Sequence, residues 1–174
     1  MERRLVIKQV LIMAGGLALL PSCLREEGKS TVQLKNITVS LDEENLLAEI
    51  AETIIPRTST PGARELKLHL FVLKMLDDCY EEADQLRFVK GLELFKEQTR
   101  DQFGKSFGKL SVHQRESMLS KLENNPSQEL SAFYKITKEK TIDGYLNSRY
   151  VMTSLVIYEL VPGRYNGYYP VKTA

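Results

Sequence analysis

The sequence predicts an all-α protein: a small orthogonal or irregular bundle of about five to six helices with an irregular C-terminal tail. Three observations support this fold class. Apolar residues recur at helical spacing in successive segments, serine-led capping patterns precede two of them, and no segment keeps a strand-like alternation over its whole length. A chain of 174 residues is long enough for one domain with a real core.

Composition and motifs exclude several classes of function. The chain has 24 Lys and Arg against 23 Asp and Glu, whereas a dedicated nucleic-acid binder shows a basic excess. Two cysteines exclude a disulfide-dense scaffold and a four-cysteine metal site. HExxH, CxxCH, GxGxxG and Walker A motifs are missing from the sequence. We therefore predict no catalytic, cofactor-binding or metal-binding residue in this chain and no nucleic-acid partner.

Residues 1–22 are predicted to be an export signal. Arg3 and Arg4 belong to a basic start, and the apolar run from Val10 to Leu20 follows. As a helix this run rises only about 16 Å, too short for a bilayer core of about 30 Å, so it indicates a signal peptide rather than a membrane span. The paired arginines and the residues up to Lys8 are similar to a twin-arginine signal, and general secretion is the alternative.

The sequence from Leu20 to Cys23 resembles a bacterial lipobox, which predicts acylation of Cys23. Acyl chains there would tether the protein to a membrane surface without spanning it, on the periplasmic side of the cell envelope. The alternative is ordinary cleavage with Cys23 as a free thiol. Residues 23–40 are polar and mixed without a helical stripe, so we expect a lipid-anchored flexible tether, followed by a folded domain over residues 41–174.

The first helix of the domain is predicted to begin after Ser40, because Glu43 three positions later completes a capping box. Its apolar stripe is formed by Leu46, Leu47, Ile50 and Ile54. Pro56 prevents continuation past Ile55. Thr60 and Pro61 have the pattern of an N-cap and first helical residue, so we expect the next helix to open there.

The second helix is predicted from five residues that share one face at helical spacing: Leu68, Val72, Met75, Leu76 and Cys79. Cys79 is interpreted as a buried small apolar residue, and the alternative is an intermolecular disulfide. The pairs Asp77-Asp78 and Glu81-Glu82 are interpreted as solvated ends of adjacent helices.

Four more helices and a tail complete the prediction. A helix over about 81–103 carries Phe88, Leu92 and Phe95, and a shorter one after a Ser111–Gln114 capping box carries Met118, Leu119 and Leu122. A helix after Asn125–Gln128 aligns Leu130, Phe133, Tyr134, Thr137 and Thr141 and is expected to stop at Gly144. A last helix is expected around 148–158, with Val151, Ser154, Leu155 and Tyr158 on one face, before the irregular aromatic tail 162–174.

Several segments resemble a known family. Ile54–Arg64 is similar to the I-I-P-x-T-x-T-P-G-A segment of gluconate 2-dehydrogenase subunit 3 proteins, and Asp78–Tyr80 follows it. Gly144-Tyr145 and Val161–Gly167 resemble the family's G-Y and V-P-G-x-Y-x-G elements. The resemblance spans roughly residues 41 to 170.

This resemblance implies a non-catalytic accessory subunit of an oxidoreductase complex. Its partner would be a large FAD-dependent dehydrogenase of the glucose–methanol–choline type that oxidises sugars, sugar acids or glycosides. FAD would lie in that partner and haem c in a third subunit, a cytochrome c that takes the electrons. The small subunit would carry the export signal, support maturation and export of the large chain, and anchor it through the lipid. The residues implied at the partner interface are Pro56, Arg57, Thr58, Thr60, Pro61, Gly62, Pro162, Gly163, Arg164, Tyr165, Gly167 and Tyr168.

Alternatives remain for these residues and for the whole chain. Arg57 is placed either to bond the last carbonyls of the preceding helix or to reach a partner carboxylate. The tail tyrosines either anchor a contact or pack back on the body. His69 and His113 lack neighbouring ligands and are interpreted as ordinary histidines. The competing function is a free-standing lipoprotein that binds an envelope component or ligand through its tail.

Overall fold

The computed structural model describes residues 30–123, 125–156, 163, 167–168 and 170. Within these residues the elements are α2 (Leu41–Ile54), α3 (Leu68–Cys79), α4 (Glu82–Phe103), the 3-10 turn η1 (Phe107–Lys109), α5 (Val112–Leu122), α6 (Gln128–Leu146) and the π-helical turn η2 (Val151–Leu155). The all-α prediction is confirmed, and no strand occurs in the described part of the chain.

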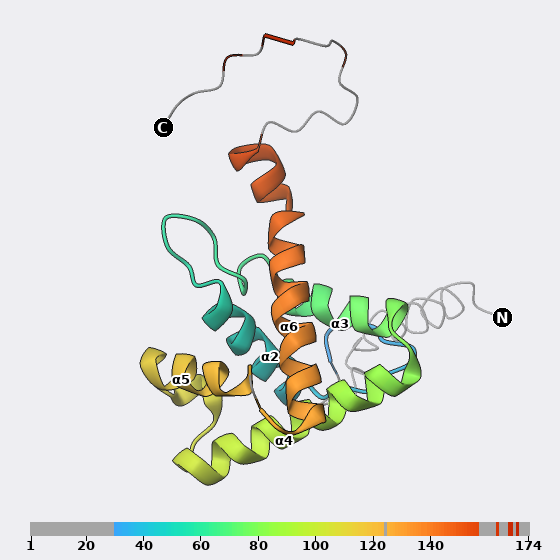
Figure 1. Cartoon of the computed structure of the whole chain (residues 1–174), viewed down its shortest axis with the longest axis vertical. Coiled ribbons are helices and arrows are strands. Elements are labelled where there is room, and N and C mark those ends of the chain that lie inside the picture. The colour runs from blue at the N-terminus through green and yellow to red at the C-terminus, as the bar shows by residue number, and fades with distance from the viewer. Residues whose placement is uncertain (1–29, 124, 157–162, 164–166, 169, 171–174) are drawn as a thin grey trace, which may run out of the picture.

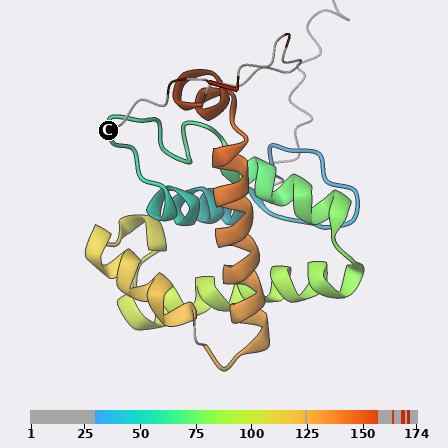
Figure 2. The ribbon, with the colours of Figure 1, turned by 45° about the horizontal axis from the view of Figure 1, so that its top comes forward.

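Helix α6 is the central element of the bundle. It runs through the middle of the molecule, with α2 and α5 on one side and α3 on the other, while α4 crosses one end (Figures 1 and 2). Its contacts reach α2, α3, α4, α5 and η2. The helices cross one another rather than lying parallel, so this is an irregular bundle.

Aromatic side chains form the centre of the core where α4 meets α6. Phe88 and Phe133 pack edge to face with ring centroids 5.1 Å apart, and Phe95 packs against both Phe133 and Phe107 at 5.9 and 5.3 Å. All four rings are buried. The apolar stripes predicted for these two helices therefore form the core, and burial of such rings is a main source of stability.

Gly91 allows α4 and α6 to approach closely. A Cβ atom at this position would lie 2.3 Å from the Glu129 carbonyl oxygen and 2.5 Å from Phe133 Cβ. Because these neighbours are backbone and the stem of a buried side chain, a larger residue would push the helices apart.

Both predicted capping boxes are confirmed. The side-chain oxygen of Ser40 accepts from the backbone N–H of Glu43 while the Glu43 carboxylate accepts from the Ser40 N–H, and Ser111 with Gln114 repeats the arrangement at α5. Each box satisfies two backbone donors that a helix start leaves unpaired. The starts of α2 and α5 are thus set locally.

The prediction of a flexible tether over residues 23–40 is wrong for residues 30–40, and residues 23–29 lie outside the described part. Residues 30–37, which we call the strap, lie against the body; Val32, Leu34 and Ile37 pack onto the core, and Val39 just beyond is buried. Two acidic residues of the helices hold the strap. The Glu44 carboxylate on α2 accepts from the N–H and hydroxyl of Thr31.

Asp77 on α3 is the second holding residue, and its predicted place at a solvated helix end is wrong. The residue is 1% exposed. Its carboxylate accepts the backbone N–H groups of Lys35, Asn36 and Ile37 at 2.9, 2.7 and 3.2 Å, and its own carbonyl accepts from the Asn36 side chain. These bonds give the buried charge the partners it needs.

Two helix boundaries also differ from the prediction. Thr60 and Pro61 do not open a helix: α3 starts at Leu68, after Lys67 in a left-handed conformation with φ of 55°. Gly144 lies inside α6, which continues to Leu146, and a Cβ atom at this glycine would lie 2.7 Å from the Phe71 ring.

The last helix and Cys79 need correction as well. The last helix is shorter than the predicted 148–158: the chain is helical from residue 149 to residue 155, and the last five of these residues form the π-helical turn η2. Val151 is buried there as predicted, but Ser154 and Leu155 are exposed, and Tyr158 lies outside the described residues. Cys79 is exposed, so its interpretation as a buried residue is wrong. It is the last residue of α3.

Candidate partner interface

The loop from residue 55 to residue 67, between α2 and α3, contains the first family-like segment. Its base is closed by the Glu52 carboxylate on α2, whose two oxygens accept the backbone N–H groups of Arg57 at 3.0 Å and Arg64 at 2.8 Å. The Ala63 N–H also donates to the Ile55 carbonyl at 2.9 Å. These bonds fix the two ends of the loop side by side, so its tip projects as a defined shape.

Gly62 is needed for this closure. A Cβ atom there would lie 2.5 and 2.6 Å from the Glu52 carboxylate oxygens and 2.7 Å from the backbone nitrogen of Arg57. Any side chain would therefore displace the group that holds the loop. This close approach explains why a glycine occupies this position of the family-like segment.

A second carboxylate on α2 links the loop to α5. Glu49 forms ion pairs with the Arg64 and Arg115 guanidinium groups, the latter at 3.0 Å. Arg115 also donates to the carbonyls of Leu110 and Gly108. Sequence analysis missed both Glu49 and Glu52, although their spacing of three places them on one face of α2, beside the predicted apolar stripe.

The end of α6 joins the loop to the second family-like element. The Tyr145 hydroxyl donates to the Thr60 hydroxyl at 3.3 Å, and its ring packs on a small buried cluster of Ala51, Ala63 and Leu68. Gly144, beside it, contacts Phe71 and Leu68 of α3. Two segments about eighty residues apart in sequence thus form one surface.

The tip of the loop is open to solvent. Pro56, Arg57 and Thr58 are exposed, and the Arg57 side chain is 75% exposed with a single distant ion pair, 3.7 Å from Glu65. The role expected for Arg57 inside the chain is not found, because the interaction recorded for its guanidinium is with Glu65 and not with the carbonyls at the end of α2. The side chain is available to a partner carboxylate.

The elements at the loop end of the molecule carry exposed apolar side chains. Leu146 at the end of α6 and Leu155 in η2 are 54% and 56% exposed, and Val156 and Phe71 are also exposed. The loop and η2 lie at the same end of α6 in both views (Figures 1 and 2). We call this surface, made of the loop tip, Tyr145, Leu146, Leu155 and Val156, the apical surface. Large exposed apolar patches are a common feature of protein interaction sites.

The other predicted residues are placed in part. Thr60 and Pro61 are half-buried and Gly62 is buried at the base of the loop. Gly163, Gly167 and Tyr168 are exposed, Tyr168 by 97%. Pro162, Arg164 and Tyr165, like Arg3, Arg4 and Cys23, lie outside the described residues.

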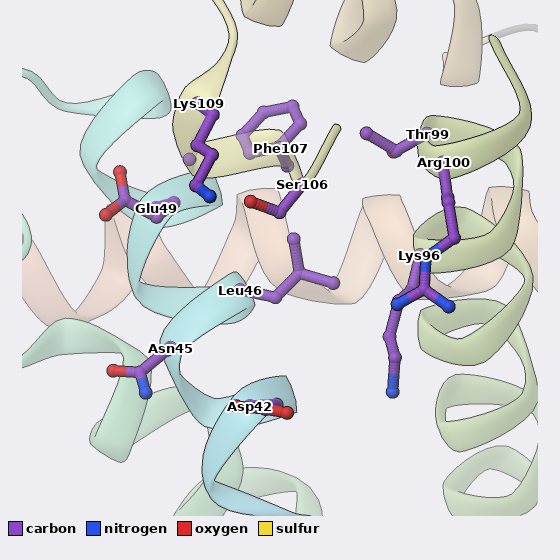
Figure 3. A pocket seen from close by; sticks show the side chains of 11 residues that line it. Asp42, Asn45, Leu46, Glu49, Lys96, Thr99, Arg100, Ser106, Phe107 and Lys109 are labelled. Atoms are coloured by element: carbon purple, nitrogen blue, oxygen red, sulfur yellow. The ribbon is translucent and has the colours of Figure 1, made fainter. Parts of the chain in front are cut away.

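A separate cavity of about 390 Å³ lies between α2, α4 and η1. Figure 3 shows Lys96 and Arg100 on one wall and Asp42 and Glu49 on the other, beneath Lys109. Lys96 is paired with Glu43 at 3.2 Å. Partial burial raises the pKa of the Glu43 carboxyl, but hydrogen bonds from Ser40 and, to a smaller extent, Lys96 outweigh burial and lower this pKa below its ordinary value. The charged side chains that line this cavity are of both signs.

The two histidines lie on different helices. His69 is buried, and burial lowers its pKa, while His113 is exposed on α5. Among the described residues no group of three or more His, Cys, Asp or Glu is arranged to hold a metal ion. Over the same residues, no helix has the length and apolar character needed to cross a bilayer.

The fold and the loop define a small all-α protein in which a braced loop between α2 and α3 meets the end of α6. The family model of gluconate 2-dehydrogenase subunit 3 matches residues 41–163. The chain therefore belongs to the gluconate 2-dehydrogenase subunit 3 family, as its sequence segments suggested. Comparisons with curated proteins and with solved structures found no match.

Proposed function

We propose that this chain is a non-catalytic accessory subunit that binds a large FAD-dependent dehydrogenase of the glucose–methanol–choline type. The family name supports a subunit of a dehydrogenase complex, and the proposal extends this to the partner and its flavin. The observation that carries the proposal is the apical surface, where two family-like segments meet beside exposed apolar side chains. A hydrophobic centre with a polar rim is the usual anatomy of a protein–protein interface.

The apical surface suits a partner rather than a small substrate. The loop tip offers the largely exposed Arg57 guanidinium, and Leu146 and Leu155 offer apolar area. Arginine and apolar anchors of this kind contribute most when they are desolvated by a partner. The complex would oxidise sugars, sugar acids or glycosides, with FAD in the large subunit and haem c in a cytochrome.

The proposed role also includes the export and membrane attachment of the complex. The signal with Arg3 and Arg4 would export the complex, and acylation of Cys23 would hold it on the periplasmic side of the cell envelope. A lipid-modified small subunit would thereby anchor a large subunit without an anchor of its own.

Affinity capture of the chain from solubilised membranes tests the proposal. We expect a large flavoprotein to copurify, identified by mass spectrometry and by its flavin absorbance. Deletion of this chain should abolish sugar-dehydrogenase activity in the periplasm, and reintroduction should restore it. Activity that survives deletion, or a monodisperse chain without a partner, would instead favour a free-standing lipoprotein.

A further inference from the structure

The packed strap shortens the link between the predicted lipid and the body. Ser30, the first described residue, follows Cys23 by seven positions, whereas the helical body begins at Leu41. Seven extended residues span at most about 25 Å, while the seventeen from Cys23 to Ser40 would span about 60 Å. Because Glu44 and Asp77 hold the strap on the body, the free link is the shorter one, of about 25 Å.

This difference in length decides which sides of the body can face a bilayer. A compact domain of about 130 residues has a radius of about 18 Å, so its half circumference is about 55 Å. A link of about 25 Å cannot pass around such a body, whereas one of about 60 Å can. With the strap docked, the body must keep the strap side near its anchor.

The apical surface lies elsewhere on the molecule. The strap lies beside α3 on one flank of α6, and the loop between α2 and α3 lies on the other flank in both views (Figures 1 and 2). An anchor on the strap side therefore leaves the loop open to a partner in the aqueous phase.

We propose that the strap is an orienting device: it presents its own side of the protein to the lipid bilayer and turns the apical loop away from it. The inference rests on the proposed lipid at Cys23. Hydrogen bonds from five strap groups to two buried carboxylates supply the holding force. We expect the strap side to face a lipid surface, because the link between Cys23 and Ser30 is too short to reach around the body.

The test uses a tryptophan, because the chain has none of its own. Residues 23–174 with Cys79→Ser are coupled at Cys23 to a maleimide phospholipid and bound to phosphatidylcholine vesicles that contain a nitroxide-labelled lipid. One variant carries Gln33→Trp on the strap and a matched one carries Ser120→Trp on α5, both at exposed positions. We expect strong quenching of the strap tryptophan and little quenching of the α5 tryptophan.

A lengthened link provides the second measurement. Ten Gly/Ser residues inserted between residues 29 and 30 leave the strap and fold untouched, and we expect them to abolish the difference in quenching. Equal quenching at the two positions without the insertion would overturn the proposal, as would an unchanged difference with it. Because the lipid is attached chemically, these results do not depend on acylation in the cell, and capture of the partner tests the proposed function separately.

Discussion

Asp77 organises a segment about forty residues away in the sequence. Burial by itself raises the pKa of its carboxyl, but the three strap N–H groups and nearby Lys74 outweigh burial and lower the pKa below its ordinary value of 3.8. The native state therefore stabilises the ionised carboxylate of Asp77. The strap is therefore held by a charge that persists under all but strongly acid conditions.

Replacement of this charge gives the first prediction. Asp77→Asn removes the ionised acceptor, and we expect the free energy of unfolding to fall by about 2 kcal/mol near neutral pH, measured by chemical denaturation. Asp78→Asn is the control, since Asp78 is exposed and its pair with Lys74 contributes little. Equal effects of the two substitutions would contradict the structure.

The pH dependence has a definite sign. Because the native pKa of Asp77 is depressed, its contribution is complete above 3.8 and is lost as the pH falls toward the lower native value. The stability difference between the wild type and Asp77→Asn should therefore shrink as denaturation curves are recorded below about pH 4. A difference that grew with acid would show that the carboxylate is not the holding group.

Glu52 is the corresponding residue of the loop. In Glu52→Gln one accepting oxygen becomes an amide donor, so one of the Arg57 and Arg64 N–H groups loses its acceptor. We expect faster hydrogen exchange of these two amides, with a global loss of about 1 kcal/mol. Glu65→Gln, which removes only an exposed ion pair with Arg57, should leave both amides protected.

At the scale of elements, the crossing of α4 and α6 sets the shape of the bundle. Alanine is favoured over glycine in a helix by about 1 kcal/mol, yet the added Cβ at residue 91 would collide with the backbone of α6. We expect Gly91→Ala to lower the free energy of unfolding by about 1 to 3 kcal/mol in thermal or chemical melts. Glu93→Ala, at an exposed position of α4, should be neutral or slightly stabilising; a stabilising Gly91→Ala would mean that the helices are farther apart.

At the scale of the whole molecule, substitutions on the apical surface should affect partner binding without affecting folding. Leu146→Asp and Leu155→Asp place charges where the proposed flavoprotein would cover apolar groups, so both should abolish its copurification while circular dichroism stays unchanged. Leu86→Asp, at a residue 55% exposed on α4, is the matched control and should leave copurification intact. Loss with the control alone would move the interface to another face.

Local patterns were enough to predict most helices. The Ser40 and Ser111 capping boxes and the stripes through Phe88 and Phe133 depend on residues within a few positions of each other, and the structure confirms them. The predicted helix start at Thr60 is wrong, because the Glu52 carboxylate on α2 accepts backbone N–H groups of the loop and holds it in another conformation. Gly144 does not end its helix as predicted; the structure instead places it against Phe71 of α3, a contact that no local pattern contains.

By itself the sequence determined the helical class, the helix starts with their own caps, and the family, because each depends on neighbouring residues or on ordered segments. Only the tertiary structure decided that residues 30–37 dock as a strap, that Asp77 is buried, and that Tyr145 meets Thr60. The physical reason is the same in each case. A buried carboxylate or a closed loop is stable only with donors brought from distant parts of the chain, and folding alone brings them together.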